Sequence, residues 1–229
     1  MTLILSGTDG LSDIDGSAAT PAVRGTDANT GIFFGTDIIG FSEGGVEAMR
    51  INASGNVEMV GTLTTASRGI AKASMPAGTV LQVVSTTKTD TFTSTTTVAF
   101  TDITGFSVSI TPSSATSKIL VTVSGTCSGQ SATSGSNLRL MRDSTAIGVG
   151  DAAGSRSRAT TNSYQADANQ SNPFSMNFLD SPSTTSATTY KVQFFISAGT
   201  FYFNRAQSDS DAVGVHRYAS TITVMEIAV

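Results

Sequence analysis

From Thr79 to Val229, apolar and small polar residues alternate with a period of two in one segment after another. The clearest cases are residues 106–110, 119–123, 174–178 and 190–196. Successive side chains of a β-strand point to opposite faces, so this spacing predicts strands with one buried and one polar face. Turn signals separate the segments, which is typical of an antiparallel sandwich. We therefore predict eight or nine strands over 79–229, in two sheets of four like a jelly roll.

The composition favours strands over helices. Ser and Thr account for 67 of the 229 residues, charged residues make up 13%, and Trp is absent. The branched Cβ of Thr and its competing hydroxyl disfavour helix interiors. No stretch of about twelve residues carries an apolar stripe at helical spacing. The sequence thus predicts an all-β protein.

Residues 1–62 have a different organisation from the rest of the chain. Short apolar runs at 31–34, 37–41 and 46–51 predict strands of a few residues, too few for a core of their own. Phe33, Phe41, Met49 and Val57 follow one another at intervals of eight residues. This regularity predicts a short-stranded N-terminal shaft of intertwined chains. Residues 63–78 lack periodicity and end in Pro-Ala-Gly, which indicates a linker.

The final strand-like segment, residues 220–229, is apolar on both of its faces. Ile222 and Val224 point one way, whereas Met225, Ile227 and Val229 point the other way. The first pair is expected to close the core of the sandwich. The second set needs cover from another chain, which predicts a closed cyclic oligomer with these residues near its axis.

Charge and hydropathy exclude several classes of function. The net charge of −4 and the scattered Lys and Arg residues argue against nucleic-acid binding. No apolar run approaches the ~18 residues of a membrane span, and Met1–Ser6 lacks the features of a signal peptide. We therefore expect synthesis in the cytoplasm and no membrane insertion. The lone Cys127 follows an apolar strand and is expected to be a buried small hydrophobe.

Several stretches resemble the tail-fibre and receptor-binding proteins of bacteriophages, particularly those of marine phages. They are residues 17–34 and 45–57, with their Thr-Gly-Ile-Phe-Phe and Met-Arg-Ile elements, residues 98–121, and the closing Ile-Thr-Val-Met-Glu-Ile. The resemblance implies a homotrimer on the virion with a thin N-terminal shaft and a distal β-sandwich head that binds a host-surface glycan or outer-membrane protein. It implies no catalytic residues. The N-terminal segment would join other tail or virion proteins.

Catalysis and metal binding have little support in the sequence. The single histidine, His216, has no Gly-x-Ser-x-Gly element beside it, so an edge or surface position is the simpler interpretation. Asp209 and Asp211 would offer oxygens to Ca²⁺ but lack the remaining features of a calcium loop. We expect no metal, no cofactor and no enzyme activity. A glycan depolymerase stays as an alternative, with its carboxylates drawn from Asp143, Asp151, Asp167, Asp180, Asp209 and Asp211.

Three polar segments, 128–136, 151–170 and 207–214, are predicted to be long loops, where binding usually resides. Aromatic and fork-shaped side chains beside them suit recognition of a saccharide or a protein. A head-decoration or tail-adaptor protein without a receptor site is the alternative. The predicted binding residues are Arg156, Arg158, Tyr164, Tyr202, Asn204, Arg205, Arg217 and Tyr218. The predicted trimer-interface residues are Phe33, Phe41, Met49, Met225, Ile227 and Val229.

Overall fold

A computed structural model describes residues 5–6, 10–11, 15–60, 75–96, 99–129, 135–164 and 169–229. All regular elements in these ranges are β-strands and all pairings are antiparallel, as predicted. The same ranges contain no helix long and apolar enough to cross a membrane. The chain divides into two compact units, residues 1–69 and 70–229. Most of the predicted linker lies outside the described residues.

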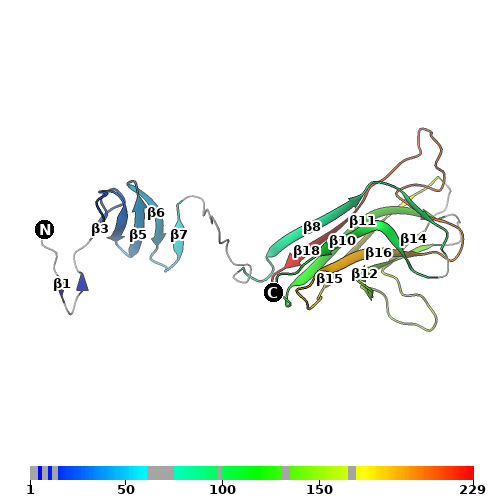
Figure 1. Ribbon diagram of the computed structural model, residues 1–229, viewed down its shortest axis with the longest axis horizontal. Coiled ribbons are helices and arrows are strands. Elements are labelled where there is room, and N and C mark those ends of the chain that lie inside the picture. Colours follow the sequence, from blue (N-terminus) through cyan, green and yellow to red (C-terminus); the bar gives the residue numbers. More distant parts are fainter. Residues whose placement is uncertain are drawn as a thin grey trace. The chain divides into compact units, whose positions relative to one another are not determined.

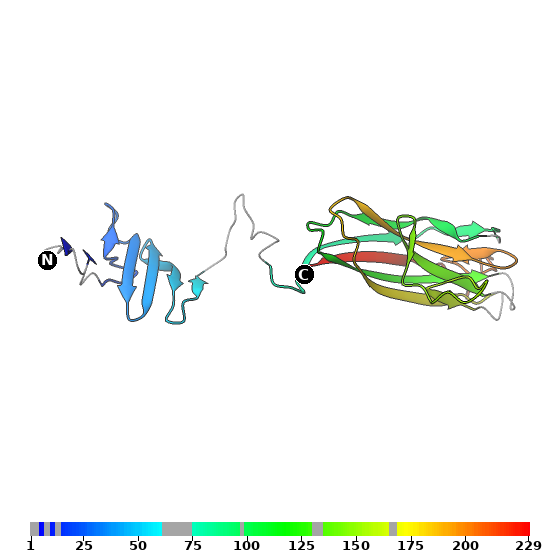
Figure 2. The ribbon, with the colours of Figure 1, turned by 90° about the horizontal axis from the view of Figure 1, so that it is seen from below.

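The first unit is built on a five-stranded antiparallel meander in which every strand pairs with its neighbours in the same chain (Figures 1 and 2). Asp37 and the Gly44–Gly45 pair, all at positive φ, form the tight turns between its central strands. A separate hairpin of β1 (Leu5–Ser6) and β2 (Gly10–Leu11) precedes it. The meander strands are β3 (Val23–Arg24), β4 (Gly31–Gly35), β5 (Ile38–Glu43), β6 (Val46–Ile51) and β7 (Val57–Met59).

One face of this sheet is polar and contains a single large ring. Phe33 is only 5% exposed and lies over its cross-strand partner Gly40, where a Cβ atom would overlap the ring. Arg50 on the same face contacts Glu47 and Glu58. A glycine opposite an aromatic residue is a usual sign of such close approach within a sheet.

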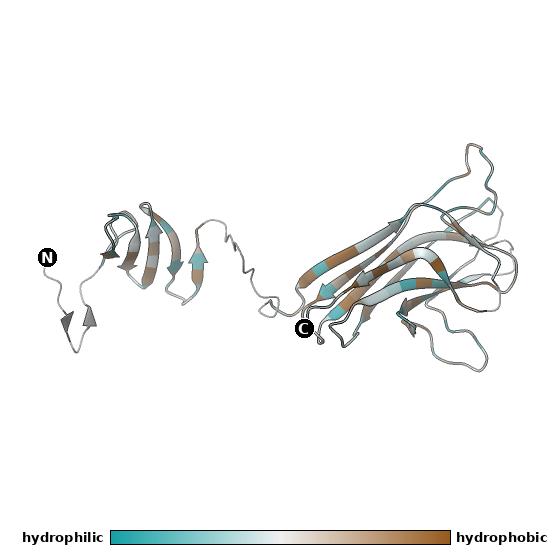
Figure 3. Ribbon diagram, in the orientation of Figure 1, coloured by the Kyte–Doolittle hydropathy of each residue, from teal (hydrophilic) through white to brown (hydrophobic). Residues whose placement is uncertain are grey.

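The other face of the sheet is apolar, and no second layer from the described part of this unit covers it. The register aligns one apolar residue from each of the five strands in a row, and a second row lies beside it (Figure 3). All nine of these apolar side chains are left partly or largely in water, up to 63% exposed at Val57. We call this surface the apolar face; its residues are Val23, Ile32, Phe41, Met49 and Met59 in one row and Phe34, Ile39, Ile51 and Val57 in the other.

The second unit is a jelly-roll-like sandwich of two sheets. In the larger sheet, β11 pairs with β15 along one edge; along its other edge it pairs first with β18 and then with β17. β8 and β9 extend these two strands outward. In the smaller sheet, β16 lies between β10 and β12, and β13 and β14 share the far edge of β12. The strands are β8 (Val80–Lys88), β9 (Phe92–Ser94), β10 (Thr101–Ile110), β11 (Lys118–Gly129), β12 (Ser136–Arg142), β13 (Thr145–Ile147), β14 (Thr161–Ser163), β15 (Asn172–Asp180), β16 (Thr188–Phe195), β17 (Phe201–Phe203) and β18 (Ser220–Ile227).

The inner faces of the two sheets close a continuous hydrophobic core. Phe194 from the smaller sheet stacks on Phe201 from the larger one, with ring centroids 4.3 Å apart. Ile222 and Val224 are fully buried, as the alternation predicted. Cys127 is also fully buried, which confirms its interpretation as a small hydrophobe, and burial raises the pKa of its thiol to about 12.

The sandwich has more strands than the sequence predicted. Its six-stranded and five-stranded sheets replace the expected two sheets of four. The difference arises from three-residue strands such as β13 and β14, which are too short to show a period. The apolar residues at 95–100 also predict a strand, which is wrong in its described part, because β9 ends at Ser94 and β10 begins at Thr101.

A buried carboxylate fastens one end of the sandwich. Glu226 continues the inner face of β18 and is 0% exposed. One of its oxygens accepts hydrogen bonds from the backbone N–H and hydroxyl of Ser113, at 2.7 and 2.6 Å, and the other accepts one from Gln82 at 2.6 Å. It thereby ties β18 to β8 and to the β10–β11 loop. Burial raises the pKa of Glu226, but the hydrogen bonds lower it by more, so the pKa lies below its ordinary 4.5.

The lowered pKa of Glu226 predicts that the sandwich loses stability in acid. A carboxylate with a depressed folded-state pKa stabilises the fold above its unfolded pKa, and this contribution is lost as the pH falls through the folded value. In Glu226→Gln, the free energy of unfolding should therefore fall less steeply below pH 4.5 than in the parent, and it should be lower at neutral pH. Urea unfolding at a series of pH values measures both effects. The exposed Asp211→Asn is the control, and equal acid slopes for parent and Glu226→Gln would contradict the assignment.

Candidate functional site

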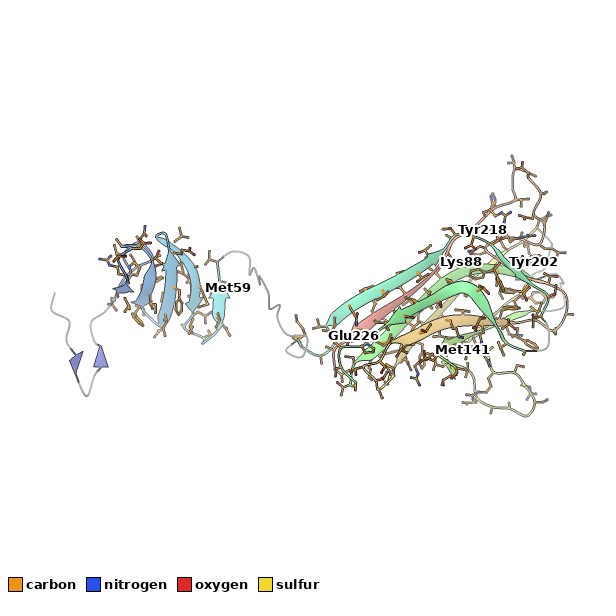
Figure 4. The ribbon with its side chains drawn as sticks, in the orientation of Figure 1. Met59, Lys88, Met141, Tyr202, Tyr218 and Glu226 are labelled. Carbon is orange, nitrogen blue, oxygen red and sulfur yellow. The ribbon has the colours of Figure 1, made fainter. Side chains whose placement is uncertain are left out.

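A cluster of aromatic and charged side chains lies at the end of the sandwich opposite to Glu226 (Figure 4). The chain leaves β17 at Phe203, forms a loop, and returns to β18 at Ser220. An isolated antiparallel bridge between Arg205 and Arg217 closes the base of this loop. We call the group formed by Tyr202, Arg205, Asp209, Arg217 and Tyr218 the distal cluster.

Asp209 is the centre of the distal cluster. Arg205 approaches one of its oxygens at 3.0 Å, and Arg217 lies 2.6 Å from the other. The guanidinium of Arg205 also lies over the ring of Tyr202, 4.7 Å from its centroid. Such cation–π stacking fixes a long side chain in one orientation. The cluster thus presents a net positive, partly pre-ordered surface of two rings and two guanidinium groups.

Tyr202 and Tyr218 supply the aromatic planes of this surface. Phe201 and Phe203 are fully buried whereas Tyr202 is half-exposed, so the predicted outward direction of Tyr202 is confirmed. Tyr218 is half-exposed, and its backbone N–H bonds to the carbonyl of Asn204 at 3.1 Å. His216 makes an edge-to-face contact with Tyr218, with ring centroids 6.4 Å apart. An open depression of about 320 Å³ beside the cluster is lined by Asp209, Asp211, Val215 and Arg217.

Asn204 is not a surface residue, contrary to its prediction as a binding residue. It is 0% exposed and adopts a positive φ of 60°. Its amide donates to the carbonyls of Lys88 and Asp90 at 2.8 and 3.0 Å, and its oxygen accepts from Ser220 at 2.6 Å. Asparagine tolerates this backbone conformation, and its amide satisfies buried carbonyls that would otherwise be unpaired. Asn204 therefore holds the base of the loop, and its side chain is not exposed on the surface.

The remaining predicted binding residues lie away from the distal cluster in the fold. Arg156 and Arg158 belong to the loop between β13 and β14, where both are exposed and donate to that loop's own carbonyls at Ala153 and Gly150. Tyr164 follows β14, is 56% exposed, and its carbonyl accepts a hydrogen bond from Asn172. The structure therefore divides the eight predicted residues into one cluster, one separate loop, one separate tyrosine and one buried residue.

Three of the carboxylates proposed for catalysis or calcium binding, those of Asp143, Asp180 and Asp209, are engaged in other contacts, whereas Asp151 and Asp211 are exposed. Both oxygens of Asp209 are occupied by arginines, which compete with a cation for the same lone pairs. Asp180 is buried and accepts from Arg142 at 2.8 Å and from Tyr190 at 2.7 Å. Asp167 lies outside the described residues. Within the described ranges no group of three or more His, Cys, Asp or Glu side chains is arranged to hold a metal.

The predicted association residues fall on two surfaces, one in each unit. Phe41 and Met49 are neighbours in the longer row of the apolar face. Phe33 is on the opposite, polar face, because the hairpin pairs Phe41 with Ile32 and not with Phe33. A spacing of eight residues predicts a shared face only when the turn preserves the register.

In the sandwich, Met225 and Ile227 lie on the outer face of β18 and are half-exposed. The register places Val83, Met225, Leu120 and Leu179 in one row across β8, β18, β11 and β15. Ile227 continues this patch beside Val80, and Val229 is 67% exposed. The rest of this outer face, further along the same strands, consists mainly of Ser, Thr and Asn side chains with Pro173, and Lys118 lies beside Ile227. We call this outer surface of the larger sheet the neutral face.

No protein-family model matches the chain, and the search of curated proteins gave no match either. Solved structures that are similar to it include that of infectious bursal disease virus strain Gx, with a TM-score of 0.37, 15% identity, and coverage of 83% of this chain and 46% of that one. A mutant VP2 protein of the same virus in T=1 particles gives a TM-score of 0.36 and 14% identity, covering 90% of this chain and 50% of that one. The chain thus spans about half the length of these structures. At this level the likeness assigns neither a family nor a function.

The buried position of Asn204 makes a testable prediction. Asn204→Ala removes the three hydrogen bonds of the Asn204 side chain and puts alanine, which tolerates positive φ less well than asparagine, at this position, so the free energy of unfolding should fall by about 2–4 kcal/mol. Chemical denaturation measures this loss. Asn177→Ala, on the exposed outer side of β15, is the matched control and should change stability by less than about 0.5 kcal/mol. Equal effects of the two substitutions would show that Asn204 has no structural role.

Proposed function

We propose that this protein is a homotrimeric, non-catalytic attachment protein of a bacteriophage virion, a tail fibre whose sandwich head binds the host surface. The observation that carries the proposal is the apolar face of residues 15–60. A single sheet with two rows of apolar side chains in water is poorly stable as an isolated layer. In a trimer, three copies packed around an axis would bury their apolar faces against one another.

Self-association through the apolar face needs no exchange of strands, because each ladder is complete within its own chain. We therefore propose three complete sheets packed face to face, in place of the intertwined shaft expected from the sequence. Every fully buried Val, Ile, Phe or Met side chain contributes about 1.5–3 kcal/mol, so two rows per chain supply enough apolar area for a stable trimer. The polar face with Glu47, Arg50 and Glu58 would then point to water.

The neutral face offers the sandwich a second contact of the same kind. Its apolar row, from Val83 to Leu179, is flanked by hydroxyl side chains and by one charged residue, Lys118. Depletion of charge at the centre is typical of the core of a protein interface. Identical uncharged surfaces also approach one another without like-charge repulsion. We propose that Met225, Ile227 and Val229 lie near the threefold axis of the heads.

The distal cluster is the proposed receptor contact. It combines half-exposed aromatic rings with guanidinium groups held by Asp209, which suits stacking on a sugar ring together with hydrogen bonds to its hydroxyl groups. A trimer carries three copies of the cluster, and simultaneous binding of two sites raises the apparent affinity by ~10²–10⁴. The N-terminal segment would join the chain to other tail or virion proteins. The resemblance to phage receptor-binding proteins supports this arrangement.

Charge on the apolar face should abolish assembly. Met49→Asp places a carboxylate in the centre of the longer row, where burial without a partner costs several kcal/mol. The parent should be a trimer in light scattering coupled to size-exclusion chromatography, and Met49→Asp should be a monomer or unfolded. Glu58→Gln, on the polar face, is the control and should stay trimeric.

Ile227→Asp extends this test to the head and should lower the dissociation temperature of the trimer. Thr104→Asp, an exposed position on β10, should leave it unchanged. A monomeric parent protein at micromolar concentration, or a fully trimeric and heat-stable Ile227→Asp, would contradict the proposed packing.

Receptor binding is tested with the full-length fluorescent protein and a panel of bacterial cells. We expect binding to particular strains, and we expect Arg205→Ala with Arg217→Ala to reduce it at least tenfold by loss of charge-assisted hydrogen bonds. Asp151→Ala, exposed in the β13–β14 loop, is the control. Trimeric protein that binds none of the strains would favour a head-decoration or tail-adaptor role. Release of reducing sugar from bacterial envelopes would instead favour a depolymerase.

A further inference from the structure

The outer face of the smaller sheet differs in chemistry from the neutral face of the larger one. Arg139 of β12, Gln193 of β16 and Asp102 of β10 are direct cross-strand partners and form a row across three strands. Lys191, two residues before Gln193, lies beside this row. These four side chains come from three separate parts of the sequence, and strand pairing alone brings them together. We call this surface the charged face.

The four side chains form one continuous hydrogen-bond network. Arg139 donates through Nε to the amide oxygen of Gln193 at 2.9 Å. The amide nitrogen of Gln193 donates to Asp102 at 2.7 Å, and Lys191 donates to the other oxygen of Asp102, also at 2.7 Å. Each member fixes the orientation of the next, so the network is ordered before any ligand arrives.

Asp102 and Arg139 of this network stay charged in the folded protein. Burial raises the pKa of Asp102, but the hydrogen bonds from Lys191 and Gln193 lower it by more, so the pKa lies below its ordinary value. Asp102 is therefore ionised at neutral pH. Its charge in turn opposes the lowering of the Arg139 pKa by burial.

An aromatic pair borders the network at one end. Phe100 and Phe195 are half-buried, with ring centroids 5.5 Å apart. The guanidinium of Arg139 lies over the Phe100 ring, 4.1 Å from its centroid. Arg139 is thereby held from two sides, by a hydrogen bond through Nε and by stacking on the ring. Its orientation is set by rigid strands, which position side chains more accurately than loops do.

Next to the network lies an open groove of about 570 Å³. Met141, 4% exposed, contributes an apolar side chain to it, and Asp143 stands at its far end with an oxygen 2.9 Å from the backbone nitrogen of Thr189. The volume falls in the range of sites for small ligands. The groove is lined by Arg139, Met141, Asp143, Thr189, Lys191 and Gln193.

We infer that the charged face is a second binding site, which takes an uncharged hexose unit of a polysaccharide in the groove between Arg139 and Asp143. A sugar ring offers hydroxyl groups that donate and accept, and an apolar face formed by its C–H groups. The groove supplies cationic donors at Arg139 and Lys191 and carboxylate acceptors at Asp102 and Asp143. The half-buried Phe100 and Phe195 rings at the end of the network supply the apolar surface.

The balance of charge selects the class of ligand. Two cations and two carboxylates lie in and beside the groove, so it has no net charge with which to attract an anion such as a uronate or a phosphate. The groove is open to solvent, so it can admit a sugar unit that is part of a longer chain. The site is separate from the distal cluster and does not depend on it.

A glycan array tests this inference with the full-length protein. The probes are neutral tetrasaccharides of glucose, galactose or mannose, and uronate-containing tetrasaccharides of the same length. We expect binding to at least one neutral probe, with affinity reduced about tenfold or more in Arg139→Ala and in Gln193→Ala. The bound sugar should also protect Lys191 from acetylation, as measured by mass spectrometry of the digested protein.

Controls separate this site from the proposed receptor contact and from loss of fold. Asp151→Ala, exposed in the β13–β14 loop, should leave neutral-sugar binding unchanged, and Arg139→Ala should leave the thermal unfolding temperature within a few degrees of the parent. The same array is run with Arg139→Ala added to the Arg205→Ala, Arg217→Ala double variant, so that the loss it causes is measured without any contribution from the distal cluster. Gln193→Ala provides the same test if Arg139→Ala unfolds. Absence of binding to every neutral probe, a preference for the uronate probes, or undiminished binding by folded Arg139→Ala and Gln193→Ala would each overturn the inference.

Discussion

The larger sheet of the sandwich depends on strand β11. This strand pairs with β15 along one edge and with β18 and then β17 along the other, so three strands meet on its backbone. Its alternate residues Ile119, Val121 and Val123 are at most 3% exposed and fill the core. Because the side-chain period of a strand is two, a shift of one residue in any of these pairings would exchange core and surface. The apolar core residues therefore fix the register of the strand pairings. This register in turn determines which residues lie side by side on the outer face of the sheet.

The two outer faces of the sandwich carry different chemistry as a consequence of this register. The neutral face has an apolar row and hydroxyl side chains, which suit contact with an identical copy. The charged face has Arg139, Gln193 and Asp102 in one row, which suits a polar ligand and opposes close packing against another charged surface. The proposed trimer and the proposed sugar site thus occupy opposite sides of the same core and do not compete for the same residues.

Buried polar residues at both ends of the sandwich hold the loops that carry these surfaces. Glu226 fastens the β10–β11 loop at one end, and Asn204 fastens the loop of the distal cluster at the other. Each is fully satisfied by hydrogen bonds, so each specifies one loop position without leaving an unpaired group. Neither residue could be recognised from the sequence: a lone Glu in an apolar strand or a lone Asn after a Phe-Tyr-Phe run gives no sign of its partners.

The sequence by itself determined the all-β class, the two-faced strands and the inward direction of Ile222 and Val224, because these follow from a period of two that is local to each strand. It also indicated correctly that Tyr202 points outward between buried phenylalanines. Tertiary structure alone decided that Phe33 and Phe41 lie on opposite faces, that Asn204 is buried, and that Asp102 meets Lys191 and Gln193. Those outcomes depend on hairpin register and on pairing between residues far apart in the chain, and alternation within one strand carries no information about either.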